Sequence, residues 1–229
     1  MSMATWVWAV IAVAALGLVA YWLLIVTEGT YLGSGIVVLL YDWVARRYDG
    51  IKDVHYVNEM AFLGIPLRRA LEHIDKPVIL DVATGTGRMP LVLVRQLDYD
   101  GLVVGVELSR RMLAEAQHAL AGFEHAALLR GDASRLAFTD ASCDALTCLE
   151  ALEFMVQPQR VLEEMTRVVK PGGVLLLSNR IGPDAWFYPG RLAGRGRLER
   201  RLHALGLDVR TERWQTHYDL VWAYKPVVR

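Results

Sequence analysis

The sequence has 229 residues, of which 54% are hydrophobic, and its 25 basic and 25 acidic side chains give a formal net charge of zero. This balance provides no basic footprint for a nucleic acid, and the length accommodates one domain of ordinary size plus an additional segment. The two cysteines, Cys143 and Cys148, belong to no Cys-x-x-Cys pair and no Cys/His cluster, so we expect no metal site.

The additional segment lies at the N-terminus. Residues 4–26 carry no charged side chain, and as a helix at ~1.5 Å per residue they would extend about 34 Å, enough to cross a hydrocarbon core with some tilt. A buried soluble helix is rarely apolar on every face over so many turns. A cleaved signal peptide would have a basic residue before a shorter apolar run and an Ala-x-Ala site after it. We therefore predict that residues 1–28 form a membrane anchor helix.

The flanking charges give this helix only a slight bias in orientation. No charged side chain precedes it, whereas Glu28 and then Arg46 and Arg47 follow. The positive-inside rule then places the rest of the chain in the cytoplasm. Cys143 and Cys148 are five positions apart on one predicted buried strand, where alternation would point them to opposite faces, and unpaired cysteines agree with that compartment. We predict a single-pass membrane protein whose body faces the cytoplasm.

Residues 29–75 are expected to form an interfacial and helical entry segment. The apolar run from Gly35 to Leu40 is too short to span a membrane, so we assign it to the interface or to the start of the soluble domain. Asn58 to Ile74 has the spacing of an amphipathic helix. The apolar side of that helix is predicted to hold Phe62, Leu63, Leu67, Ala70, Leu71 and Ile74.

Strand-like and helix-like segments alternate in the remaining chain, residues 76–229. The predicted strands are 78–82, 102–107, 127–130, 145–149, 174–178, 208–214 and 218–224. The predicted helices are 88–98, 109–121 with Ser109 as N-cap, 158–169, which Pro171-Gly172-Gly173 should end, and 198–205. Such alternation predicts an α/β fold with a doubly wound, mostly parallel seven-stranded sheet. Only three residues separate the last two strands, which allows a hairpin but no parallel crossover.

The most informative motif is the glycine-rich turn after the first predicted strand. An apolar run from Val78 ends in Asp81, and Gly85 and Gly87 then let the backbone turn tightly and approach a ligand. The N–H groups of the following helix would face the same ligand, so the pattern is typical of a nucleotide-type cofactor site. A nicotinamide-binding turn would have a third glycine where this chain has Pro90.

Between about Tyr41 and Lys225 the chain resembles the class I S-adenosylmethionine-dependent methyltransferases. Asp81 to Gly87 matches the family's acidic-x-(Gly/Ala)-x-Gly-x-Gly motif, and Arg167 to Gly173 matches its Arg-Val-Leu-Lys-Pro-Gly-Gly element. Cys143-Asp144 stands at the Phe-Asp of the fourth motif. The terminal hairpin corresponds to the reversed seventh strand of this Rossmann-like fold, a feature that nicotinamide folds lack.

The resemblance also implies which residues hold the cofactor, S-adenosylmethionine. Glu107 would bind the ribose hydroxyls, because a carboxylate can accept a hydrogen bond from each of them. Asp132 and Ala133 would contact the adenine. The complete implied set is Tyr48, Asp81, Ala83, Gly85, Gly87, Glu107, Leu108, Asp132, Ala133 and Glu150. Simpler alternatives stay open: Asp81 can cap its turn, Asp132 can be an ordinary turn residue, and Glu150 can start a helix instead of lying beside the methionine portion.

Within the class, the chain looks most like the quinone-biosynthesis methyltransferases. Tyr41 to Asp49 resembles their (Phe/Tyr)-Asp-x-x-Ala-x-x-Tyr-Asp segment, which closes over the cofactor and would place Tyr48 against it. One difference concerns the acceptor: Ala151-Leu152-Glu153-Phe154 stands where many of these enzymes have Ala-Leu-His-His.

No catalytic residue is predicted, because the sulfonium methyl is already activated and transfer mainly requires alignment of the acceptor. If the acceptor must lose a proton, the candidate bases are His55, Tyr56, Glu153 and His217. Trp186, Phe187 and Tyr188 either line an apolar acceptor pocket or fold onto the core.

These observations predict a membrane-anchored methyltransferase that acts on a small hydrophobic acceptor, such as a quinone precursor or a lipid, and not on nucleic acid. A catalytically silent cofactor-binding membrane subunit is the main alternative, and a nicotinamide-dependent oxidoreductase is a second. The arginines at 191, 195, 197, 200 and 201 are expected to lie on a solvated helix face, with attraction to anionic lipid headgroups as the alternative.

Overall fold

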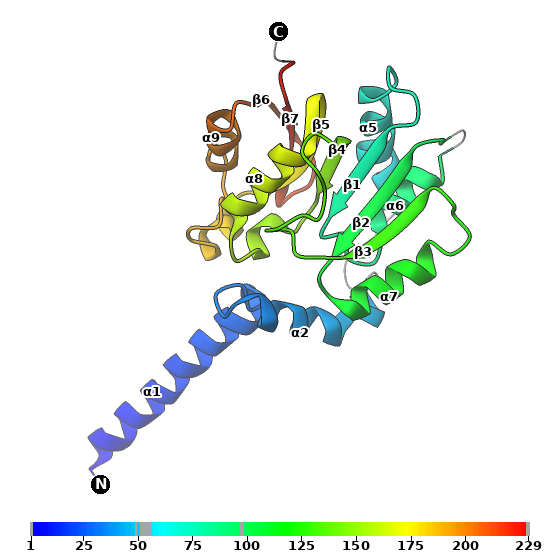
Figure 1. Ribbon diagram of the computed structural model, residues 1–229. Helices are drawn as coiled ribbons and strands as arrows, with labels where there is room; N and C mark the ends of the chain where they lie inside the picture. The colour runs from blue at the N-terminus through cyan, green and yellow to red at the C-terminus, as the bar shows by residue number, and fades with distance from the viewer. Residues whose placement is uncertain (1, 49, 51–55, 97–98, 228–229) are drawn as a thin grey trace.

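A single seven-stranded sheet organises the body of the molecule, and one long helix, α1, extends away from it (Figure 1). The computed structural model describes residues 2–48, 50, 56–96 and 99–227. The strand order is β3-β2-β1-β4-β5-β7-β6. The chain enters at β1, proceeds outward to β3 and then returns to β4, so the topological switch point lies between β1 and β4. In doubly wound sheets, ligands bind outside the carboxyl ends of the strands at this point.

The strands confirm the predicted fold class. They are β1 (Val78–Val82), β2 (Leu102–Glu107), β3 (Ala126–Arg130), β4 (Cys143–Cys148), β5 (Val169–Arg180), β6 (Asp208–Arg213) and β7 (Tyr218–Tyr224). The pairs from β3 to β5 are parallel, whereas β7 is antiparallel to both β5 and β6. The short connection between β6 and β7 forces this reversal, as the sequence predicts.

Helices cover both faces of the sheet. One face packs against α8 (Pro158–Val168) and α9 (Arg197–Ala204), which contribute buried residues such as Leu162 and Leu202. The other packs against α6 (Arg88–Val94) and the helical stretch formed by α4 (Tyr56–Glu59), a π-helical turn over residues 60–64, and α5 (Ile65–Ala70). The predicted apolar side of this stretch is wrong at Phe62, whose side chain is half exposed. Ser109 caps α7 (Arg110–Ala119) as predicted, accepting from the Met112 N–H.

The Pro171-Gly172-Gly173 element does not end a helix, contrary to the prediction. Helix α8 ends at Val168 and β5 begins at the next residue, so the element lies inside the strand. The Gly172 N–H donates to the Lys225 carbonyl oxygen at 2.7 Å, and a Cβ at Gly173 would lie 2.6 Å from the Asp144 carbonyl oxygen. The glycines therefore permit close approach of neighbouring strands.

The two cysteines are buried and free, but they do not point to opposite faces. The pairing of β4 with β5 shifts register between Cys143 and Ala145. Both thiols consequently pack into the same core cluster, beside Leu146. The simple alternation on which the prediction depended therefore does not hold at Cys143, where the pairing with β5 is irregular.

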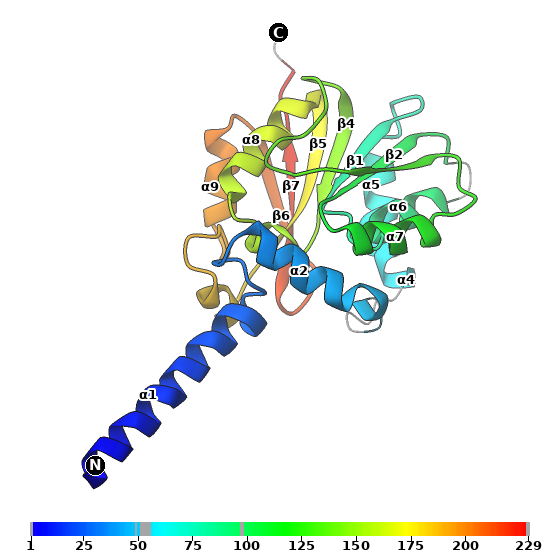
Figure 2. The same cartoon turned by 60° about the horizontal axis from the view of Figure 1, so that its bottom comes forward.

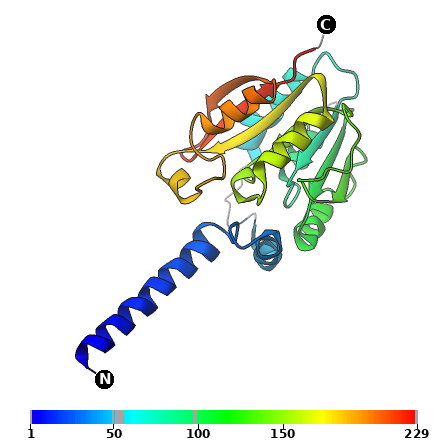
Figure 3. The same cartoon turned by 60° about the vertical axis from the view of Figure 1, so that its left-hand side comes forward.

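The N-terminal helices lie outside this core. Helix α1 (Met3–Tyr21) continues into a π-helical turn, Trp22–Val26, and α2 (Ser34–Val44) follows after a bend. Met3–Val26 is long and apolar enough to cross a membrane, with a mean hydropathy of 2.6 and no buried part. Figures 2 and 3 show that α1 meets the domain at the C-terminal end of the helix and projects away from there. Helix α2 lies across the edge of the domain.

The bend between these helices, residues 26–31, packs firmly onto the domain, and we call it the α1–α2 corner. Thr27 and Thr30 are completely buried. The Thr30 hydroxyl donates to the Phe154 carbonyl oxygen at 2.7 Å, and the Tyr188 hydroxyl donates to the Val26 carbonyl oxygen at 2.7 Å. The end of the apolar helix is thus part of the folded domain, not a flexible linker.

Candidate functional site

The turn after β1 has an unusual backbone conformation. Ala83, Gly85 and Gly87 have φ angles of +57°, +58° and +85°, and a non-glycine residue in this left-handed region costs about 1–2 kcal/mol. A Cβ at Gly85 would meet no atom within 4 Å, so this residue opens onto free space. The two glycines adopt this conformation at little cost, so the strain falls on Ala83, and a strained non-glycine residue is typical of a functional turn.

Gly87 has a packing role. It precedes α6, and a Cβ there would lie 3.2 Å from the Ala116 side chain and 3.3 Å from Leu120. Asp81 is likewise internal: it is 3% exposed and accepts a hydrogen bond from the Thr147 hydroxyl. Burial raises the pKa of Asp81 to about 6, although the hydrogen bond from Thr147 opposes this shift. Neither Asp81 nor Gly87 lines the pocket described next.

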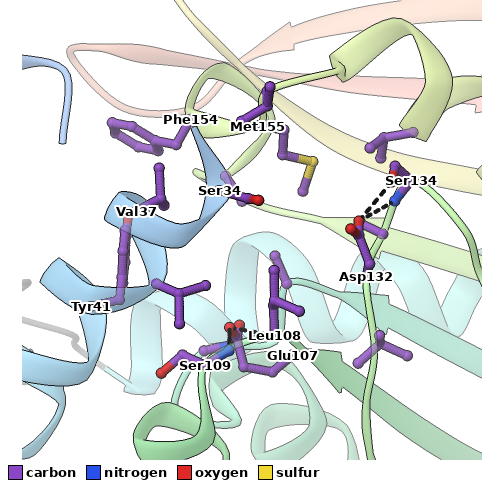
Figure 4. Close-up of a pocket in the computed structure, with 18 of the residues that line it drawn as sticks. Ser34, Val37, Tyr41, Glu107, Leu108, Ser109, Asp132, Ser134, Phe154 and Met155 are labelled. Carbon is purple, nitrogen blue, oxygen red and sulfur yellow. Dashed lines mark hydrogen bonds between the residues drawn. The ribbon is translucent and has the colours of Figure 1, made fainter. Parts of the chain in front are cut away.

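The other predicted cofactor residues line one pocket of about 230 Å³ at the carboxyl ends of the strands. They are Tyr48, Ala83, Gly85, Glu107, Leu108, Asp132, Ala133 and Glu150. Figure 4 shows Ser34, Val37 and Tyr41 of α2 facing Glu107 and Leu108 across this space. Helix α2 is therefore a wall of the pocket; the sequence indicated this role only from Tyr41 onward, and not for Ser34 and Val37.

Glu107 is fixed at the end of β2 by backbone donors. The N–H groups of Leu108 and Ser109 each lie 2.8 Å from Oε1, and the Gly85 N–H lies 3.1 Å from Oε2. Burial raises the pKa of Glu107, and these three hydrogen bonds oppose the shift. Because a carboxylate offers about four acceptor positions, Oε2 retains the capacity to accept a hydrogen bond from a ligand hydroxyl.

Asp132 is both a turn residue and a pocket residue, the two roles that its motif allowed. Its Oδ1 accepts from both the N–H and the hydroxyl of Ser134, each at 2.8 Å, which is the geometry of an Asx turn (Figure 4). Asp132 and Ala133 nevertheless line the pocket. Because β3 pairs with β2, this turn follows the strand next to Glu107 and holds Asp132 and Ala133 at the pocket.

Helix α2 is tied to the domain through Asp42. The Ser109 hydroxyl and the Arg111 N–H both donate to Asp42 Oδ1, the latter at 3.1 Å. The rings of Tyr41 and Tyr48 pack with centroids 5.8 Å apart. Burial raises the pKa of Tyr48, which keeps its hydroxyl protonated. The segment that resembles a cofactor-covering element thus lies against the pocket.

A buried ion-pair network supports the site, and the sequence analysis did not find it. Arg88 donates to Glu150 Oε1 at 2.9 Å and to Glu59 Oε2 at 2.6 Å. Burial lowers the pKa of Arg88, but the two carboxylates outweigh this and raise it. Glu150 has a left-handed φ of +51° and so does not start a helix. The available signal was Arg88 itself, the only charge in the apolar helix α6.

Glu153 does not share a helical face with Glu150. It is 2% exposed and accepts from Arg180 Nε at 2.9 Å and from the Tyr218 hydroxyl at 2.6 Å. It lies outside the pocket lining, so its carboxylate is committed to this internal cluster. The Arg180 guanidinium also lies over the Tyr188 ring, 5.1 Å from its centroid.

The remaining candidate bases and the aromatic residues predicted near the acceptor do not gather at one place. His217 pairs with Asp184 at 2.9 Å on the surface, Tyr56 lies beneath Arg95, and neither lines the pocket. His55 lies outside the described residues. The aromatic trio divides: Trp186 is 86% exposed and Phe187 47%, whereas Tyr188 is buried.

The arginines between residues 191 and 201 do not form one solvated helix face, contrary to the prediction. Arg191 donates to carbonyl oxygens of Met155 at 3.0 Å and Thr30 at 2.9 Å. Arg195 precedes α9 and pairs with Asp219 at 2.6 Å. Most of these arginine side chains are therefore held by contacts with residues that are distant in the sequence.

The pocket suits a nucleoside-containing cofactor. A carboxylate at the end of β2 matches a ribose diol, the open backbone at Gly85 permits close approach, and Leu108 and Val161 provide apolar surface for a flat base. Residues 80–177 match the family model described as a methyltransferase domain.

The chain is similar to the demethylmenaquinone methyltransferase of Clavibacter sepedonicus (32% identity over 143 residues, covering 62% of this chain and 57% of that protein). It is also similar to that of Desulfitobacterium hafniense (27% over 187 residues, covering 71% and 72%). The chain spans about half of the length of several curated relatives that it matches.

The fold is that of a solved S-adenosylmethionine-dependent methyltransferase from Aquifex aeolicus, with a TM-score of 0.57, 20% identity and coverage of 74% of this chain and 98% of that one. The [4+2]-cyclase SpnF shares it as well, with a TM-score of 0.62, 20% identity and coverage of 82% and 96%. The motifs, the sheet and these matches agree, and together they support a class I S-adenosylmethionine-dependent methyltransferase similar to the quinone-biosynthesis type.

Proposed function

We propose that this chain is a membrane-anchored enzyme that transfers the methyl group of S-adenosylmethionine to a small hydrophobic acceptor of the quinone-precursor class. The observation that carries the proposal is the pocket between Glu107 and α2: its floor is the cofactor end of the sheet, and its opposite wall follows directly after the apolar helix α1. The demethylmenaquinone methyltransferases among the relatives support the acceptor class.

In this proposal, Glu107 accepts hydrogen bonds from the ribose, while Leu108, Asp132 and Ala133 position the base. Ala83, Gly85 and Glu150 lie along the rest of the cofactor, and Tyr48 covers it. When bound, S-adenosylmethionine supplies an activated methyl group. The protein then needs to align the acceptor and exclude water, and no side chain has to provide a base for an acceptor that is already nucleophilic.

The apolar part of the pocket wall supports a hydrophobic acceptor. Val37 and Val38 of α2 face the space from one side, and Phe154, Met155 and Val156 border it from another. Small-molecule sites are typically lined by such side chains with few polar groups. Glu153, which replaces a histidine of the resembled motif, is internal, so acceptor recognition here differs from that of enzymes with the Ala-Leu-His-His sequence.

The α1–α2 corner supports a retained anchor. Val26, Thr30 and Tyr31 each bond to the domain, so the end of the apolar helix is integral to the fold. We place the helix in the membrane as a single pass, with the domain on the cytoplasmic side, where S-adenosylmethionine is made.

The test is a methyl-transfer assay with the full chain reconstituted into lipid vesicles. Labelled S-adenosylmethionine is supplied with a demethylated quinol dissolved in the bilayer, and in parallel with a short-chain, water-soluble analogue. The proposal expects labelled methylated quinol and S-adenosylhomocysteine, with transfer to the bilayer-dissolved acceptor faster than to the analogue. Activity on soluble acceptors alone, at the same rate in vesicles and in detergent, would contradict the proposal that the acceptor is dissolved in the membrane.

A further inference from the structure

Helix α2 has two apolar faces with different surroundings. Val37 and Tyr41 point to the cofactor pocket. Leu39 and Trp43 lie four positions apart, on one side of the helix, and are 63% and 80% exposed. Two large apolar side chains, exposed one turn apart on a helix whose other side is half-buried against the domain, are suited to a further partner, because soluble domains seldom leave large contiguous apolar surface in water.

A second exposed aromatic pair lies close to the end of the membrane-length helix. Trp186 and Phe187 belong to the 3₁₀ turn Pro183–Phe187 after β5 and are 86% and 47% exposed. The next residue, Tyr188, is buried and bonds to the Val26 carbonyl oxygen, where the apolar segment ends. That hydrogen bond fixes the aromatic pair beside the point where α1 meets the domain.

The two exposed groups share one end of the molecule. Figures 1 and 3 both show α2 and the loop between β5 and α9 at the end of the domain from which α1 projects. Arg46 and Arg47 follow α2 and are exposed. Tryptophan is enriched at the level of lipid headgroups, and arginines beside it are attracted to anionic lipids.

We propose that Leu39, Trp43, Trp186 and Phe187, the interfacial rim, insert into the headgroup region of the bilayer that α1 spans. This inference rests on the membrane anchoring proposed above and extends it: the domain is held by its rim as well as by its anchor. The partner is a lipid surface, since the rim is continuous with a helix of membrane length through the α1–α2 corner.

Docking by the rim places α2 between the lipid and the cofactor pocket. The same helix then contacts headgroups with Leu39 and Trp43 and walls the pocket with Val37 and Tyr41. A hydrophobic acceptor dissolved in the bilayer reaches the pocket past this helix without crossing bulk water. Orientation by the rim thus serves substrate delivery, beyond simple tethering.

The experiment measures the depth of single positions in the full chain reconstituted into phosphatidylcholine–phosphatidylglycerol vesicles. Leu39→Cys, Phe187→Cys and, as a matched control, Leu102→Cys are labelled with an environment-sensitive fluorophore. Leu102 is also an exposed leucine (39%), but it lies at the amino end of β2, and the pocket lies at the carboxyl ends of the strands. The unsubstituted chain is treated in parallel to show that the buried Cys143 and Cys148 do not react.

We expect a nitroxide attached to lipid near the headgroups to quench positions 39 and 187 several-fold more than position 102, and aqueous iodide to show the reverse order. Equal iodide quenching at all three positions without lipid quenching would overturn the inference in favour of a solvated rim. Protection from both quenchers would overturn it in favour of a contact with a second copy of the chain. The readout needs neither cofactor nor acceptor, so its failure is distinct from a failure of methyl transfer.

Discussion

The Tyr188 hydroxyl donates a 2.7 Å hydrogen bond to the carbonyl oxygen of Val26, 162 positions earlier in the chain. This contact joins the last residue of the apolar helix to a residue that directly follows the exposed Trp186–Phe187 pair. The apolar helix α1 and the loop that carries Trp186 and Phe187 are therefore joined directly, and this coupling is the basis for several of the predictions below.

The α1–α2 corner is expected to contribute to the stability of the whole domain. Thr30→Val removes a buried hydroxyl and leaves the Phe154 carbonyl oxygen without its 2.7 Å donor. The expected loss is about 1–3 kcal/mol of unfolding free energy, measured by denaturant unfolding of the full chain in detergent. Thr211→Val on the exposed strand β6 is the control and should change stability by less than ~0.5 kcal/mol. Equal effects of both variants would contradict a structural role for the corner.

Two glycines of the turn after β1 should respond differently to the same substitution. Gly85→Ala and Gly87→Ala both place a methyl group on a left-handed backbone, which costs about 1–2 kcal/mol. At Gly87 the methyl also meets α7, so the melting temperature should fall further. At Gly85 it enters the pocket, so binding of S-adenosylhomocysteine should weaken more than stability. Melting curves and calorimetry of both variants provide the comparison, and identical behaviour would refute the distinction.

Arg88 is expected to hold the carboxylate side of the site together. Arg88→Met removes the cation shared by Glu59 and Glu150, and loss of one partner from a buried ion pair typically costs about 3–5 kcal/mol. Arg160→Met is the matched control, because Arg160 is 54% exposed and its pairs are 3.8–3.9 Å long; surface pairs contribute about 0–1 kcal/mol. Chemical unfolding of both variants measures the difference, which should be at least ~2 kcal/mol.

Asp81 should make folding depend on pH between about 4 and 6. Its pKa is raised by burial to about 6 in the folded protein, against ~3.9 in an unfolded chain. The folded state therefore binds the proton more tightly, and the stability linked to this group is present at low pH and lost as pH rises through 6. In the Asp81→Asn variant, the decrease in the free energy of unfolding across this pH range should be smaller by up to about 3 kcal/mol. Unfolding free energies at pH 4.5 and 7 for both proteins test it; an unchanged slope in the variant would contradict the assignment.

The interfacial rim should influence turnover only when the acceptor is in the bilayer. The double variant Trp43→Ser/Trp186→Ser leaves the pocket lining intact, so affinity for S-adenosylhomocysteine should be unchanged. Turnover of a bilayer-dissolved quinol should fall about tenfold, equivalent to ~1.4 kcal/mol, while turnover of a soluble analogue stays constant. Leu102→Ser is the control. A uniform fall for both acceptors would indicate a structural defect instead.

Local patterns predicted most of the sheet. The bounds of β1, β2 and β7 coincide with the apolar runs, and the Ser109 cap and the terminal reversal follow from capping and loop length. These features depend on residues that are close in sequence. The register shift beside Cys143 escaped prediction because it depends on how β4 pairs with β5 and not on the sequence of β4 alone.

Long-range contacts account for what the sequence did not reveal in the site. Arg88 and Glu150 are 62 positions apart, and Thr30 and Phe154 are 124 apart. The motif match identified Glu107, Asp132 and Ala133 as pocket residues, since these positions recur at fixed strand ends. It predicted a covering segment only from Tyr41, and it did not show that the first part of α2 would also line the pocket or that Glu153 would be internal.

The most direct test of the central claim is calorimetric titration of the full chain in detergent with S-adenosylhomocysteine, alongside Glu107→Ala and, as a matched control, the exposed Glu124→Ala. The account predicts micromolar binding to the unsubstituted chain and to Glu124→Ala. Affinity should fall about tenfold or more in Glu107→Ala, since a hydrogen bond to a charged group contributes about 1.5–3 kcal/mol. Equal affinity in all three proteins, or no binding to a well-folded chain, would contradict it.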